Sequence, residues 1–411
     1  MLKSKVQRMA ASCGLVVGVL AGVMVLAPSS AGAAGSPVLY NSIVSPLPGN
    51  VVSQSFEATE TSEFGNAINI GPSSGPLSNV VVTMSSWGCQ TGHWTNDTCA
   101  TAPGSTFSTP ITLNLYSLGA NGAVGSLIGT DTQTFAIPYR PSADNVHCTG
   151  AQSGEWYDAA EAACHNGLAV NITFDFSGQH LALPSSLIYG IQYNTSDYGP
   201  NPYGDGTACH ATTAGCGYDS LNVGLSSDGT AVTAGSDAFP GKLYENTKYA
   251  PYYCDNGAAG TGIFRLDSPN QDPNNCTSPS AGWALNENNG IGTAPYYVPA
   301  VQFNLPSATK LVTQPAVLEL LPGLSLLAGP TATLSSGNVP LGGQTLTFTT
   351  PSGGLLCTAT TNAVGVATCG SGQALASLLA LGYTASFAGN GSYSPTAAAG
   401  SLIVLLGFVI L

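Results

Sequence analysis

Alternation of apolar and polar positions with a period of two is the feature that most constrains the fold of this chain. Successive side chains of a strand point to opposite faces, so this pattern predicts strands with one buried face. It is clearest in residues 78–141, which we expect near the middle of a large sandwich. The inward positions there are Val80, Val82 and Met84 in one segment, and Ile111, Leu113 and Leu115 in another.

The same alternation recurs downstream and predicts a fold that is all β. With 51 glycines and 27 prolines, the chain fits many short strands joined by turns. Residues 36–306 are predicted to form a jelly-roll-like antiparallel β-sandwich with long loops. Only residues 155–167 carry a helical pattern, about three turns ending at Gly167. The inward residues of the further expected strands are Val170, Ile172, Phe174 and Phe176; Leu187, Tyr189, Ile191 and Tyr193; Leu221, Val223 and Leu225; and Val301, Phe303 and Leu305.

Residues 1–34 have the pattern of a secretory signal peptide. Lys3, Lys5 and Arg8 precede an apolar core of about 13 residues, and small residues follow it. That core is short of the roughly 20 residues of a membrane-spanning helix. We therefore expect an extracellular protein, secreted or attached to the cell surface, with no transmembrane span in the mature chain.

Charge argues against some partners. Three of the eight basic residues lie in the signal segment, which leaves five against 21 acidic residues. The resulting net charge of about −16 repels polyanions, so nucleic acid is not expected as a partner.

The cysteine count agrees with export. Without Cys13, ten of the 11 cysteines remain, an even number that suits disulfides in an oxidising compartment. Their spacing predicts five local pairs, although other connectivities are open. The pairs are Cys89–Cys99, Cys148–Cys164, Cys209–Cys216, Cys254–Cys276 and Cys357–Cys369.

A second domain is expected over residues 331–405, after a linker at 307–330 and before an apolar tail at 406–411. The leucines of residues 314–330 could instead supply a first strand of this domain. The pieces GQTLTF, TNAVGVATC, GYTASF and GNGSYSP resemble the bacterial Ig-like repeat of large surface and adhesive proteins. This resemblance covers about 75 residues and implies a small Ig-like β-sandwich. The words SSWGC, ITLNLYSL and IPYRPSAD of the first domain resemble a secreted domain of high-GC Gram-positive bacteria. That resemblance implies extracellular placement and no catalytic residue.

Candidate catalytic groups are two carboxylate clusters, which could support glycoside hydrolysis. One is Glu57, Glu60 and Glu63, and the other is Glu155, Asp158 and Glu161 on the expected helix. Neither has a recognisable motif, and solvated carboxylates explain both more simply. The His–Cys neighbours lack zinc spacing, so no metal ligand is assigned. No cofactor is expected, although Asp/Asn-rich loops leave calcium open.

Aromatic residues in polar loops are the candidate ligand-binding residues. Trp87 precedes the predicted Cys89–Cys99 loop and Trp94 lies within it, and Tyr198 and Tyr203 lie among small polar residues. Flat aromatic faces beside amides and carboxylates suit sugar rings, although tyrosines also anchor loops. The sequence favours a non-catalytic protein that binds or adheres to an extracellular polysaccharide or envelope component. A secreted carbohydrate-active hydrolase and a purely structural surface protein are the alternatives.

Overall fold

The computed structural model describes residues 37–56, 61–71, 75–92, 94, 97–193, 221–227, 232–240, 242–246, 263–267, 297–319, 325–370 and 382–405. This part of the chain is all β, as predicted, and its only helices are three single-turn 3-10 helices. None of the helices in the described ranges is long and apolar enough to cross a membrane. The expected signal segment and the expected apolar tail lie outside these ranges.

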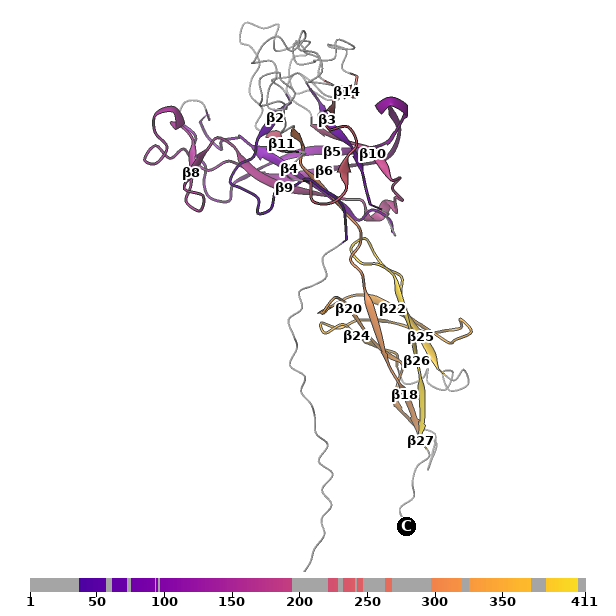
Figure 1. The fold of residues 1–411 in the computed structure, drawn as a ribbon. Helices are drawn as coiled ribbons and strands as arrows, with labels where there is room; N and C mark the ends of the chain where they lie inside the picture. The colour runs from indigo at the N-terminus through magenta and orange to yellow at the C-terminus, as the bar shows by residue number, and fades with distance from the viewer. Residues whose placement is uncertain are drawn as a thin grey trace, which may run out of the picture.

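The first sandwich consists of two seven-stranded sheets (Figure 1). In the first sheet, β4 pairs with β9 along one edge and with β16 and β11 along the other. Its strand order is β1 (Val38–Asn41), β16 (Val301–Asn304), β4 (Asn79–Ser86), β11 (Leu221–Ser227) and β15 (Tyr297–Pro299), with β2 (Ser53–Ser55) on β11 and β9 (Leu168–Asp175) on β4.

The second sheet is built around β10, which pairs antiparallel with β3 on one side and β5 on the other. The long hairpin of β5 and β6 forms one edge of this sheet. Its order is β14 (Arg265–Asp267), β13 (Leu243–Glu245), β3 (Glu63–Asn69), β10 (Ser186–Tyr193), β5 (Thr106–Leu118) and β6 (Val124–Pro138), with β12 (Ser236–Asp237) on β3.

One hydrophobic core joins the two sheets. The Tyr189 ring of β10 lies 5.9 Å from the Phe303 ring of β16, and Phe135 of β6 lies 5.0 Å from Phe174 of β9. Of the inward positions predicted from the period-two pattern, Val170 is only half-buried and packs against this core, and the others are confirmed as buried members of it. The buried positions are Val80, Val82, Met84, Ile111, Leu113, Leu115, Ile172, Phe174, Phe176, Leu187, Tyr189, Ile191, Tyr193, Leu221, Val223, Leu225, Val301, Phe303 and Leu305.

A second, smaller set of sheets follows in the chain and has its own core, in which Leu334, Leu346, Phe348 and Tyr383 are buried. Its three sheets are β17 (Lys310–Gln314), β20 (Thr331–Ser336), β21 (Val339–Pro340) and β24 (Val366–Thr368); β19 (Ser325–Ala328), β18 (Ala316–Glu319) and β27 (Leu402–Leu405); and β23 (Leu355–Thr360), β22 (Thr345–Thr349), β25 (Tyr383–Phe387) and β26 (Thr396–Gly400).

The stretch 307–330 differs from the linker expected from sequence, because it holds β17, β18 and β19. Strand β17 pairs antiparallel with β20, and β18 pairs parallel with β27. Leu311 and Ala316 are buried in the second core, so these two residues serve as strand residues. At the junction with the first sandwich, Ser307 exchanges backbone hydrogen bonds of 2.9 Å with Ser392 and Ser394.

Tyr383 ties three segments of the second sandwich together. Its hydroxyl lies 2.7 Å from the carbonyl oxygen of Thr331 and is also bonded to the carbonyl of Gln314. The same hydroxyl accepts the N–H of Thr331 at 3.2 Å. A Cβ on Gly400 would lie 2.1 Å from the Tyr383 ring, so only glycine lets β26 pass this close.

We predict that Tyr383→Phe lowers the free energy of unfolding by about 1–2 kcal/mol, because buried backbone groups lose a partner. Urea unfolding of the full chain measures this change. Tyr157→Phe is the matched control, since no hydrogen bond of that hydroxyl is seen in the described residues. Equal unfolding midpoints for Tyr383→Phe and the wild type would contradict the prediction.

Candidate functional site

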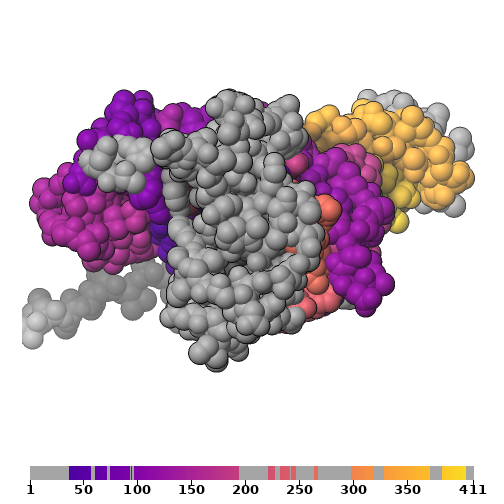
Figure 2. All heavy atoms as spheres, turned by 90° about the horizontal axis from the view of Figure 1, so that it is seen from above, coloured from indigo at the N-terminus to yellow at the C-terminus, as the bar shows by residue number. Residues whose placement is uncertain are grey.

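Residues 87–104 and 139–167 form a disulfide-rich excursion from the first sandwich, here called the stapled lobe. It leaves β4 after Ser86, returns to β9 at Leu168, and carries β8 at the left of Figure 1. Seen from above, this purple and magenta part lies on the opposite side of the view from the orange and yellow second sandwich (Figure 2). Disulfides Cys89–Cys99 and Cys148–Cys164 close its two loops.

Three of the five predicted disulfides are present in the structure: these two, and Cys357–Cys369 in the second sandwich. The other predicted pairs, Cys209–Cys216 and Cys254–Cys276, lie outside the described residues.

The helix predicted for residues 155–167 is wrong. The segment is a hairpin of β7 (Trp156–Asp158) and β8 (Ala163–His165), in which Trp156 faces His165 in register. Asp158 Oδ1 accepts the N–H of Ala160 at 2.8 Å, a side-chain bond that favours a turn over a helix. Ala162 has a φ of 51°, and residues on either side of it pair across the hairpin. Local propensity for helix is overridden by cross-strand pairing.

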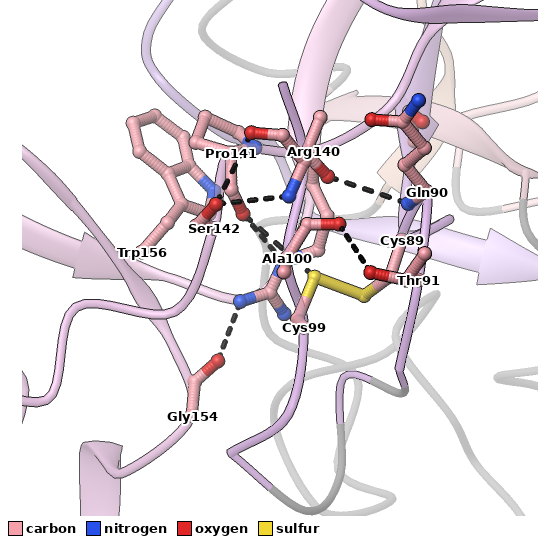
Figure 3. Close-up of a disulfide and its surroundings, with 12 residues drawn as sticks. Cys89, Gln90, Thr91, Cys99, Ala100, Arg140, Pro141, Ser142, Gly154 and Trp156 are labelled. Atoms are coloured by element: carbon pink, nitrogen blue, oxygen red, sulfur yellow. Dashed lines mark hydrogen bonds between the residues drawn. A yellow bond between two sulfur atoms is a disulfide. The ribbon is translucent and has the colours of Figure 1, made fainter. Parts of the chain in front are cut away.

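Arg140 is fully buried and holds the loops of the lobe together (Figure 3). Its Nη2 donates to the carbonyl of Gly154, and its backbone N–H donates to the carbonyl of Gly88 at 3.0 Å, next to Cys89. Burial lowers the pKa of Arg140 to about 10, and the carboxylate of Glu155 opposes that shift. The guanidinium therefore stays charged at neutral pH and anchors the base of the lobe.

Trp87 and Trp94, predicted as ligand-binding residues, are brought together. Their rings meet edge to face, with centroids 4.9 Å apart and an interplanar angle of 86°. Both rings are half-buried, and the indole N–H of Trp87 donates to Ser85 Oγ at 3.1 Å. The two indole rings thus keep part of their apolar surface exposed, and the hydrogen bond to Ser85 holds Trp87 in place. The other two predicted residues, Tyr198 and Tyr203, lie outside the described residues.

The hairpin brings acidic and imidazole groups together. Ligand atoms of Asp158, Glu161 and His165 all lie within 4.8 Å of one another. His165 Nε2 is 3.0 Å from Glu161 Oε2, and the N–H of Gly49 donates to Glu161 Oε1 at 2.7 Å. Sequence reasoning placed Asp158 and Glu161 on a helix face and missed His165. Pairing Cys148 with Cys164 was the available signal that the segment is held close to another part of the lobe.

A second Asp–His pair lies in the same lobe. His147 Nδ1 is 2.8 Å from Asp144 Oδ2, and the backbone N–H and ring of His147 lower the pKa of Asp144. The His147 ring stacks on Tyr157 with centroids 4.4 Å apart. The His147 side chain is more exposed than that of His165, and in the described part of the chain no third ligand residue joins this pair.

Of the first carboxylate cluster, Glu57 and Glu60 lie outside the described residues, and Glu63 is buried in β3. Glu63 Oε1 accepts hydrogen bonds from Asn114 Nδ2 at 3.0 Å and from the Tyr116 hydroxyl at 2.9 Å. Burial raises the pKa of Glu63, and these two hydrogen bonds oppose that shift. Its carboxyl is enclosed between strands of the second sheet and is not displayed on the surface.

Glu155, the third residue of the expected helical cluster, accepts a hydrogen bond from Asn166 Nδ2 at 3.0 Å. The hairpin therefore keeps Asp158 close to Glu161 and gives Glu155 a separate structural partner.

Comparisons with known proteins do not assign a family to the chain. No protein-family model matches it, and no match is found among curated proteins. Among solved structures, the adhesin domain of Epf from Streptococcus pyogenes aligns with 8% identity over 91% of this chain and 99% of that chain, at a TM-score of 0.22. A likeness this distant does not establish a shared fold or function.

We predict that removing Cys148–Cys164 by the double change to serine loosens the lobe. In the chain-entropy account, a crosslink of this separation contributes about 3 kcal/mol. Limited proteolysis followed by peptide mapping should show new cleavage within residues 139–167. Serine at both Cys357 and Cys369 is the matched control and should leave that pattern unchanged. The prediction is contradicted if residues 139–167 are newly cleaved in the Cys357/Cys369 variant and not in the Cys148/Cys164 variant.

We predict that Glu63→Gln flattens the dependence of stability on pH. A carboxyl whose pKa is raised by folding binds protons more tightly when folded, so its stabilising contribution is complete below the ordinary value of 4.5 and is lost as pH rises through the folded pKa. The wild type should therefore lose stability relative to Glu63→Gln across that window. Urea unfolding at a series of pH values measures the difference, and a constant difference at every pH would contradict the prediction.

Proposed function

We propose that this chain is an exported, surface-displayed binding protein whose first sandwich recognises an extracellular polysaccharide or envelope component through the stapled lobe. The observation that carries the proposal is the half-buried Trp87–Trp94 pair on a lobe closed by two disulfides. Aromatic faces contact the C–H faces of sugars, and a loop held in place loses little conformational entropy on binding.

Polar groups next to the indole pair suit hydroxyl-bearing ligands. Ser153 Oγ donates to Asp97 Oδ2 at 2.8 Å, and Asp97 lies three residues after Trp94. Gly154, which binds Arg140, approaches Asp97 so closely that a Cβ there would lie 2.7 Å from its Oδ1. A carboxylate and a hydroxyl are therefore held in the segments that contain Trp94 and Gly154, and such groups suit recognition of a polar ligand with flat apolar faces.

Extracellular placement is supported by independent features. Residues 1–34 have the pattern of a signal peptide. The disulfides of both sandwiches require an oxidising compartment to form and persist. The second sandwich, in keeping with its resemblance to Ig-like repeats, would serve as the spacer that holds the first away from its attachment.

Binding is favoured over glycoside hydrolysis by what the carboxylates do. Glu63 is buried between strands, Glu155 bonds Asn166, and Glu161 bonds both Gly49 and His165. Each of these carboxylates accepts hydrogen bonds from groups within the fold, whereas a hydrolase needs a carboxylate pair that faces a bound sugar.

The test is retention of the mature chain on a panel of insoluble polysaccharides and cell-wall preparations. We predict saturable retention on one of them, weakened about tenfold in Trp94→Ala, which corresponds to roughly 1.4 kcal/mol. Leu127→Ala removes an exposed apolar side chain from β6, outside the lobe, and is the matched control. Circular dichroism confirms that each variant is folded.

Retention that is equal in Trp94→Ala and Leu127→Ala would remove the indole pair from the binding surface. Absence of retention on every preparation, with folded and oxidised protein, would reject stable glycan binding. Release of reducing ends from any preparation would favour the hydrolase instead.

A further inference from the structure

Asp158, Glu161 and His165 form a cluster of residue types that commonly bind metal ions in proteins. Two carboxylates and one imidazole converge, with ligand atoms within 4.8 Å. Within the described ranges, the only ion-pair partner of either carboxylate is His165, and no lysine or arginine reaches them. Carboxylates this close repel one another, and a cation between them removes the repulsion.

The fold holds these side chains in place from several directions. Asp158 ends β7, His165 ends β8, and the Cys148–Cys164 disulfide fixes the residue before His165. The Trp156 ring lies 5.2 Å from the His165 ring. The N–H of Gly49 donates to Glu161 Oε1, which leaves Oε2 directed toward the imidazole. Backbone and aromatic contacts of this kind orient ligands around metal ions in proteins.

Gly49 also leaves space beside the group. A Cβ at position 49 would lie 2.7 Å from Asp158 Oδ2 and 3.0 Å from His165 Nε2. Any residue with a side chain would therefore press on both ligand atoms, and glycine keeps that space open. The side chains of His165 and Glu161 are 17% and 35% exposed, so an ion can reach them from solvent.

We propose that Asp158, Glu161 and His165 bind a divalent transition-metal ion, with zinc as the best fit. One imidazole nitrogen and two carboxylate oxygens are ligands that Zn²⁺ accepts, and three protein ligands leave a fourth position for water or a ligand. The imidazole disfavours calcium, which takes oxygen ligands. On binding, the ion replaces the contact between His165 and Glu161. This site is independent of the proposed recognition of glycans.

The test is isothermal titration calorimetry of the tag-free mature chain with ZnCl₂, after dialysis against a chelator and then its removal. We expect one equivalent to bind saturably, at least tenfold more weakly in His165→Ala and in Asp158→Asn. His147→Ala is the matched control, because it breaks the other Asp–His pair of the lobe, which no third ligand joins among the residues that the structure describes. That variant should bind as the wild type does.

Thermal unfolding supplies a second readout that does not depend on the heat of binding. Zinc should raise the unfolding temperature of the wild type and of His147→Ala, and not that of His165→Ala, because only a folded site binds the ion. The proposal is overturned if zinc does not bind saturably, if His165→Ala binds as tightly as the wild type, or if His147→Ala loses binding equally. Calcium binding that survives His165→Ala, without zinc binding, also overturns it.

Discussion

The packing of alternate side chains between two seven-stranded sheets is the constraint on which the rest of this structure depends. Tyr189 shows how completely this layer is enclosed. Its ring packs against Phe303, and its buried hydroxyl donates to the carbonyl of Pro299 at 2.7 Å. Because a shift of register by one residue would turn these side chains outward, the core fixes the register in which the strands pair. The stapled lobe begins and returns at such ends, and Ser86 Oγ links two of them by donating to the carbonyl of Pro138 at 2.6 Å.

Much of the fold could be predicted from sequence, because a strand with one buried face alternates apolar and polar residues along the chain. Val80, Val82 and Met84 needed no knowledge of their partners to be assigned inward. Local cysteine pairs were equally accessible, since short loops bring their ends together. Which sheet each strand joins was not accessible, because pairing depends on residues far away in sequence. Strand β4, for example, contacts β16, more than two hundred residues later.

The candidate site shows more clearly what could not be predicted from the sequence alone. Residues 155–167 are rich in alanine and carboxylates and favour a helix locally, yet Trp156 pairs with His165 and Cys164 bonds Cys148. Those contacts between residues distant in sequence outweigh the local helix propensity. The resulting hairpin brings Asp158 and Glu161 together with His165. The Trp87–Trp94 contact was partly foreseeable, because Trp87 precedes the small Cys89–Cys99 loop and Trp94 lies within it. The role of Arg140 had no trace in sequence, because the carbonyl of Gly154 and the neighbouring turns that enclose it have no motif.

The distribution of charge along the chain gives the two sandwiches different sensitivities to their surroundings. Residues 307–411 contain only Lys310 and Glu319 as charged side chains, and no histidine. The tyrosine that ties the second sandwich together has its pKa raised by burial, so it stays neutral under ordinary conditions. Proton uptake and ionic strength therefore act on this protein almost entirely through the acidic first sandwich. Because the second sandwich has so few titratable side chains, its own stability depends little on pH.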